Sequence, residues 1–90
     1  MEKLYTFVAD YAGGTYLYQC KAKKLAIARI EWANNLSFTK LNIREKKKLF
    51  DGLSDASIVP IDDLSNVWCF CICIKKDLAI VHCIQTCGDN

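Results

Sequence analysis

The chain has few of the residues that interrupt regular structure. Its 90 residues include one proline, Pro60, and four glycines, of which Gly13 and Gly14 are adjacent. There is no internal repeat and no low-complexity segment, so the sequence indicates neither a repeat array nor a linker. Apolar residues make up 52% of the chain, which argues against disorder. We therefore expect a single domain spanning residues 1–90.

Long apolar runs and a strong net charge are also missing. The longest apolar run, Val67–Ile74, has eight residues, whereas a membrane-spanning helix needs about 20. The apolar run at residues 4–9 ends at Asp10, too soon for a signal-peptide core. We therefore expect a cytoplasmic protein with reduced thiols and no membrane association. The net charge of +2 is too small to indicate nucleic-acid binding by itself.

The sequence lacks a recognisable set of catalytic residues. It contains no glycine-rich phosphate loop and no paired carboxylates with an acid–base signature, and His82 is its one histidine. Cys71 and His82 could be cross-strand neighbours, but no third group to orient the histidine lies in the same strands. We therefore predict that the chain is not an enzyme and has no catalytic residues. A small cysteine-dependent enzyme or metal protein is the hypothesis least favoured.

The cysteines are more numerous than in most small domains. The six are Cys20, Cys69, Cys71, Cys73, Cys83 and Cys87. Three of them alternate along residues 69–73, which would place their sulfurs about 6–7 Å apart on one face of a strand. That spacing is too wide for all three to bind one zinc ion without bending the strand. Free cysteines are commonly small buried hydrophobic residues, so we predict no metal site and no cofactor.

The N-terminal part of the sequence predicts a β-hairpin. Residues 4–11 and 15–22 are typical of strands, and Gly13-Gly14 suits a two-residue turn between them. This turn would place Tyr11 opposite Tyr16 and Phe7 opposite Cys20. One face of the hairpin is then aromatic. The other is more polar and carries Thr6, Val8, Asp10, Leu17, Gln19 and Lys21.

Two helices are predicted after this hairpin. Residues 22–36 place apolar side chains on one stripe that includes Ala28 and Trp32. A second helix should begin near Asn42, because Glu45 three residues later completes a capping box. Its predicted buried stripe consists of Ile43, Leu49, Phe50 and Leu53. Residues 54–66 are interpreted as a connecting loop, in which residues 57–61 could form a short extended piece.

The last part of the sequence predicts a second hairpin that is apolar on both faces. Residues 67–74 and 78–86 would be joined by a turn at Lys76-Asp77, with Cys71 opposite His82. The expected fold is α+β: a four-stranded antiparallel sheet in ββα(α)ββ order, with two helices mainly on one face. Two helices cannot cover both faces of a sheet, so the uncovered face is predicted to meet a second copy or another protein. The residues predicted at this interface are Cys69, Cys71, Cys73, Ile80, His82 and Ile84.

Basic side chains group around the two predicted helices. They are Lys21, Lys23, Lys24, Arg29, Arg44, Lys46, Lys47 and Lys48. Two basic helices on one side of a sheet could bind phosphates, although a solvated helix face explains the same charges. A nucleic-acid-binding module is therefore the alternative hypothesis.

Asn66-Val67-Trp68-Cys69 and the closing hairpin are similar to small immunity-type proteins of bacterial toxin systems. Residues 5–36 contain Tyr5-Thr6-Phe7-Val8, Gly13-Gly14-Thr15-Tyr16 and Trp32-Ala33-Asn34-Asn35-Leu36. These motifs resemble the opening of HicB-type antitoxins. The chain departs from HicB in lacking the loop before a Gly-Asp-Thr helix start and a DNA-binding tail. The resemblance implies a dimeric ββα module that binds a cognate toxin. The leading hypothesis is therefore a bacterial protein-binding domain, an antitoxin or immunity protein, that acts as a homodimer.

Overall fold

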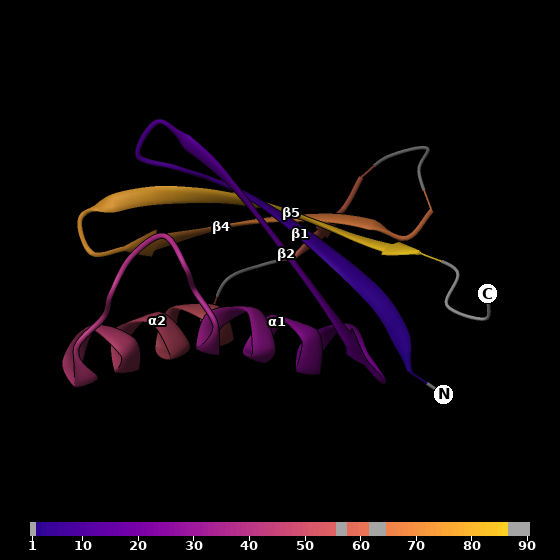
Figure 1. Cartoon of the computed structure of the whole chain (residues 1–90), viewed down its shortest axis with the longest axis horizontal. Coiled ribbons are helices and arrows are strands. Elements are labelled where there is room, and N and C mark those ends of the chain that lie inside the picture. Colours follow the sequence, from indigo (N-terminus) through magenta and orange to yellow (C-terminus); the bar gives the residue numbers. More distant parts are fainter. Residues whose placement is uncertain (1, 56–57, 62–64, 87–90) are drawn as a thin grey trace.

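The computed structural model describes residues 2–55, 58–61 and 65–86, which form one sheet and two helices (Figure 1). The elements are β1 (Lys3–Tyr11), β2 (Gly14–Ala22), α1 (Leu25–Asn34), α2 (Ile43–Asp55), β3 (Val59–Pro60), β4 (Val67–Ile74) and β5 (Asp77–Thr86). The strands are antiparallel and lie in the order β2-β1-β5-β4-β3. Both helices lie against the same face of the sheet (Figure 1).

The predicted number of strands and their order were wrong. The α+β class and the two helices are present, but the sheet has five strands rather than four, and the elements follow ββααβββ along the chain. The additional strand, β3, lies within the short extended piece expected at residues 57–61 of the connecting loop, which the predicted four-stranded sheet did not include. It has only two residues, and Pro60 cannot donate a ladder hydrogen bond, so it carries little strand signal. Its position at the edge of the sheet is where proline is tolerated.

Aromatic side chains fill the space between the sheet and the helices. Tyr5, Phe7 and Tyr11 alternate along β1, and all three are buried on the helix side. The Trp32 ring stacks on Phe7 at a centroid distance of 5.9 Å and meets the edge of Phe70 at 5.7 Å. Such packed aromatic pairs add to the free energy gained by burying their area. This cluster is the centre of the hydrophobic core.

The capping box of the second helix is confirmed. The Glu45 backbone N–H donates to Asn42 Oδ1 at 2.8 Å, and the Asn42 backbone N–H donates to Glu45 Oε1 at 3.0 Å. Leu49 and Leu53 are buried as expected, but Ile43 is 91% exposed, so its place in the buried stripe was wrong. Ile43 is the first residue of α2, and the helix contacts the sheet through its later turns.

The first helix is shorter than predicted. It covers Leu25–Asn34 rather than residues 22–36, because Ala22 still belongs to β2 and pairs with Lys3. At its C-terminus the Asn35 backbone N–H donates to the Trp32 carbonyl at 3.1 Å, and the Asn35 side chain donates to the Glu31 carbonyl at 2.8 Å. These bonds satisfy carbonyl groups that the end of a helix leaves unpaired.

Both hairpins turn one residue earlier than predicted, which shifts the pairing of their strands by two residues. The first turn is at Ala12-Gly13, where both residues have positive φ (48° and 85°), as a type I′ turn requires. Gly14 instead begins β2, and a Cβ at Gly14 would collide with the Tyr16 ring. Tyr11 therefore lies opposite Gly14, and Phe7 lies opposite Tyr18 rather than Cys20.

The second turn is at Lys75-Lys76, with Ile74 opposite Asp77. Lys75 takes the left-handed conformation here, with a φ of 59°. The shift places Cys69, and not Cys71, opposite His82.

The segment between the helices is attached to the first hairpin. Phe38 stacks on Tyr16 at 4.6 Å and also packs against Tyr11 at 5.2 Å. The Tyr11 hydroxyl donates to the carbonyl of Ile74 at 3.0 Å, which joins the first hairpin to the turn of the second. Among the residues placed by the structure, no helix has the length and apolar character to cross a membrane.

Candidate functional site

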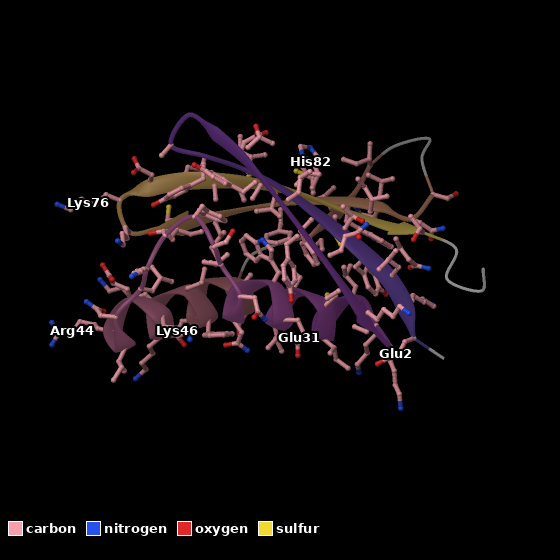
Figure 2. All side chains as sticks on the ribbon, in the orientation of Figure 1. Glu2, Glu31, Arg44, Lys46, Lys76 and His82 are labelled. Carbon is pink, nitrogen blue, oxygen red and sulfur yellow. The ribbon has the colours of Figure 1, made fainter. Side chains whose placement is uncertain are left out.

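The face of the sheet opposite the helices is largely apolar and, in the described part of the chain, has no helix over it (Figures 1 and 2). Successive side chains on a strand point to opposite faces. The residues of this face are therefore those that alternate with the core-facing residues along each strand. We call this surface the open face. On its apolar part lie Val8, Leu17, Val59, Val67, Cys69, Cys71, Cys73, Leu78, Ile80, His82 and Ile84.

One row of the open face crosses all five strands. Leu17 of β2 pairs with Val8 of β1, and Val8 pairs with His82 of β5. His82 pairs with Cys69 of β4, and Cys69 pairs with Val59 of β3. His82 therefore lies on the central strand, and its side chain points away from the helix layer (Figure 2). The two polar members of this row are flanked by aliphatic side chains on both sides.

Charged and polar pairs on this face lie toward β1 and β2. The Thr15 hydroxyl donates to Asp10 Oδ1 at 2.7 Å, and the Gln19 side-chain amide donates to the Thr6 hydroxyl at 2.8 Å. The residues described on β3, β4 and β5 contribute no charged side chain to the open face. The uncharged part of the surface thus extends from Val8 across the other half of the sheet.

The six interface residues predicted from the sequence all lie on the open face. The pairs they form differ from the prediction, with Cys71 opposite Ile80 and Ile84 opposite Val67. The structure brings them together because a slip of two residues leaves every side chain on its original face.

Three residues of the open face were not predicted from the sequence. Val8 and Leu17 are expected on the more polar face of the first hairpin, and Val59 is expected in the extended piece of the connecting loop, outside the sheet. The alternation in β1 and β2 does place Val8 and Leu17 away from the aromatic face. Nothing local predicts that β1 pairs with β5, so their continuity with the cysteines could not be inferred.

The thiols differ between the two faces. Cys71 and Cys73 are exposed, Cys69 and Cys20 are half-buried, and Cys83 is fully buried on the helix side. The expectation that the cysteines are buried thus fits Cys83 and not Cys71 or Cys73. Cys87 lies outside the described residues.

The environment of the buried thiols opposes nucleophilic chemistry. Burial raises the pKa of Cys83 to about 12, with Cys20 adding to the shift and Arg29 partly offsetting it. Burial also raises the pKa of Cys69, and neighbouring Cys71 adds to that effect. Reactive cysteines have lowered pKa values, so neither thiol is activated as a nucleophile in one copy of the chain.

Metal-ligating side chains do not gather in threes within the described residues 2–55, 58–61 and 65–86. Cys69 and His82 form a cross-strand pair, but Val8 and Val59 on either side of them in the row offer no ligand atom. A single copy therefore presents two ligands of a potential zinc site.

The predicted basic residues are divided between different parts of the molecule. Lys21 is opposite Leu4 on β2, on the helix-free side of the sheet. Lys23 and Lys24 precede α1, whereas Arg44 and Lys46 lie toward the other end of the helix layer, with Glu31 between (Figure 2). The exposed bases on α2 are Arg44, Lys46, Lys47 and Lys48.

Arg29 has a structural environment. Its guanidinium lies 5.4 Å from the centre of the Phe70 ring, a cation–π contact. Its Nη1 atom is buried and has no hydrogen-bond partner among the described residues. It is the single base on α1, so α1 is not a basic helix.

A cavity of about 550 Å³ lies between α2 and the β4–β5 turn. Its lining includes Glu45 and Lys48 from α2 and Lys75, Lys76 and Asp77 from the turn. Because these side chains carry charges of both signs, the cavity favours no particular class of ligand.

No protein-family model, curated protein or solved structure matches this chain.

Proposed function

We propose that the chain is a non-catalytic protein-binding domain that forms a homodimer through its open face. The observation that carries this proposal is the uncharged surface of β5, β4 and β3, which lies outside the hydrophobic core. Ile80 and Leu78, both exposed, lie on it. Contiguous apolar surface of this kind is typical of protein–protein contacts.

The size of the open face suits a second copy. The uncharged part consists of β4, β5, the two residues of β3 and Val8. At a strand spacing of about 4.8 Å and a rise of about 3.3 Å per residue, it projects onto roughly 330 Å² of sheet. Protruding side chains expose more area than this projection. The patch therefore matches a weak dimer contact, because stable interfaces bury about 600–800 Å² per partner.

Symmetry also favours a second copy. A two-fold contact places the same surface on both sides, and an uncharged surface meets its copy without like-charge repulsion. Two sheets can pack face to face at about 10 Å. Short aliphatic side chains such as Val8, Ile80 and Ile84 suit that spacing.

Analytical ultracentrifugation of the reduced protein at about 50 μM tests this proposal, at a concentration that populates dimers of micromolar Kd. Ile80→Lys should give a folded monomer, because a lysine would be buried without a partner. Ile27→Lys is the matched control, since Ile27 and Ile80 are both 39% exposed and Ile27 lies on α1. A monomeric parent protein, or dissociation by Ile27→Lys alone, would contradict an open-face dimer.

The partner class proposed beyond the second copy is a bacterial toxin. The resemblance of residues 5–36 to HicB-type antitoxins supports this class. A gene next to the coding sequence supplies the test: its product should arrest growth when expressed alone, and coexpression of this chain should restore growth. Growth arrest that coexpression does not relieve would argue against the antitoxin role.

The alternative function is nucleic-acid binding through α2. It is favoured by the four exposed bases in five consecutive positions of that helix, residues 44–48. Binding led by phosphate contacts must weaken steeply with salt. Titration of a mixed-sequence duplex and a single strand at two salt concentrations checks this, and absence of binding at low salt excludes it.

A further inference from the structure

Cys69 and His82 form the central pair of the row that crosses the sheet. They are direct partners in the β4–β5 ladder, and both are half-buried on the open face. Directly opposed residues have Cβ atoms about 4.5–5.5 Å apart. A thiolate and an imidazole projecting from such positions can reach one ion, and they are the ligands that zinc prefers.

A closed zinc site needs four ligands, and this chain supplies two of them here. Cys73, another exposed thiol of β4, is four residues from Cys69, or about 13 Å along the strand. A two-fold axis through the Cys69–His82 pair would bring a second thiol and a second imidazole to the same point. The site is then complete only in the dimer.

The spacing of packed sheets fits this arrangement. Two sheets that stack face to face lie about 10 Å apart, so the midplane is about 5 Å from each backbone. A cysteine sulfur stands roughly 2.5 Å above its backbone, about two bond lengths, and a zinc–sulfur bond adds about 2.3 Å. An ion at the midplane is therefore within reach of Cys69 from both copies.

Charge balance also fits an apolar interface. Two thiolates cancel the charge of Zn²⁺, and two neutral imidazoles add none, so a Cys₂His₂ site is uncharged as a whole. Burying an uncharged site between Val8 and Val59 of two sheets avoids the cost of burying an isolated ion.

We propose that two copies of this chain bind one zinc ion at the centre of an open-face dimer, with Cys69 and His82 of each copy as its ligands. The proposal rests on the proposed open-face dimer and adds a metal that stabilises it. Zinc would enter as each Cys69 thiol releases its proton, with no change in oxidation state.

The test uses the full chain, reduced with a phosphine and prepared either with zinc chloride or with a chelator. Elemental analysis should find one zinc for every two chains. Cobalt(II) in place of zinc should give the visible absorption of a tetrahedral site with thiolate ligands. The dissociation constant of the dimer, from ultracentrifugation, should rise by about a hundredfold or more in chelator.

Variants identify the ligands. Cys69→Ser and His82→Gln should each lose the bound metal and the cobalt spectrum, with far-UV circular dichroism unchanged. Cys73→Ser is the control on the same face and Cys20→Ser the control on the other face, and both should keep the metal. Full metal occupancy in His82→Gln, or its loss in Cys73→Ser, would overturn the assignment.

The oligomeric state separates this inference from the proposed function. A dimer that persists in chelator and binds no zinc overturns the metal site and leaves the open-face dimer standing. A monomer with and without zinc overturns both. One zinc per dimer, lost in both ligand variants, supports both.

Discussion

The two faces of this sheet are both apolar, yet they are built from different side chains. The covered face carries large rings such as Tyr5, Phe7 and Phe70, which reach Trp32 in the helix layer. The open face carries valine, isoleucine and cysteine, which end close to the backbone. Bulky rings fill the irregular space beneath a helix, whereas short side chains make a flat surface. In this molecule large rings from β1, β4 and α1 mark the covered face, whereas β5 contributes the smaller Ala79, Val81 and Cys83 to it.

The largest difference between the faces should appear in stability. Trp32→Ala removes a buried ring that contacts both Phe7 and Phe70, and it should cost about 3–5 kcal/mol. Leu78→Thr, at an exposed open-face position, should change the free energy of unfolding by less than about 0.5 kcal/mol. Urea unfolding followed by circular dichroism at low protein concentration measures both. Comparable losses would mean that the open face is packed within a single copy.

Thiol chemistry should distinguish the faces next. Cys71 and Cys73 are exposed, whereas Cys83 is fully buried and its pKa is raised to about 12. Alkylation requires an accessible thiolate, so Cys83 should react at least about a hundredfold more slowly than Cys71 at pH 8. Peptide mass spectrometry over time resolves the individual sites. If Cys71 is as slow as Cys83 when the protein is dilute, then the open face is covered in the monomer.

Alkaline pH should weaken the covered face selectively. The pKa of Cys83 is 9.0 in an ordinary environment and about 12 in the folded protein, so the unfolded chain loses its proton first. Its contribution to stability is therefore complete below pH 9 and is lost as the pH rises from 9 to 12. Burial raises the pKa values of Tyr5 and Tyr18 as well, and these act in the same direction.

Urea midpoints at four pH values between 8 and 11 measure this loss. Cys83→Ala should reduce the decline between pH 9 and 11, although the tyrosines keep part of it. Cys73→Ser, on the open face, should leave the decline unchanged. A decline that is the same in all three proteins would show that Cys83 does not couple folding to pH.

The smallest effect on stability should come from the capping box at the N-terminus of α2. Asn42→Ala removes one half of the capping box with Glu45 and should cost about 1 kcal/mol. Ser54→Ala, at an exposed position near the other end of α2, is the control and should cost less. Thermal unfolding measures the difference, and equal losses would mean that the cap does not hold the helix.

Local patterns predicted the faces of the strands but not their partners. Each turn lies one residue earlier than predicted, which shifts the strand pairing by two residues and preserves the period of two. Cys69 and His82 therefore stay on one face despite the incorrect register. The displacement at the first hairpin follows from Gly14, which the Tyr16 ring covers. The two glycines allow a turn at Ala12-Gly13 or at Gly13-Gly14. The packing of the Tyr16 ring against Gly14 decides between these two positions.

The features of the fold that the sequence did not predict depend on contacts between distant parts of the chain. The β1–β5 pairing joins residues such as Val8 and His82, and no local signal encodes it. The same pairing makes the open face continuous across the sheet. The two residues of β3 likewise depend on β4 for their pairing, so the sequence indicates at most an extended piece there and not a strand of the sheet.

The position of β5 in the sheet has a consequence for biosynthesis. Among the described strands it is the central one and also the last in sequence. Until the ribosome has released residues 77–86, both β1 and β4 expose an unpaired inner edge, and such edges template aggregation. A nascent chain arrested before that point therefore has two half-sheets and no complete core, and holding it soluble would be work for a chaperone.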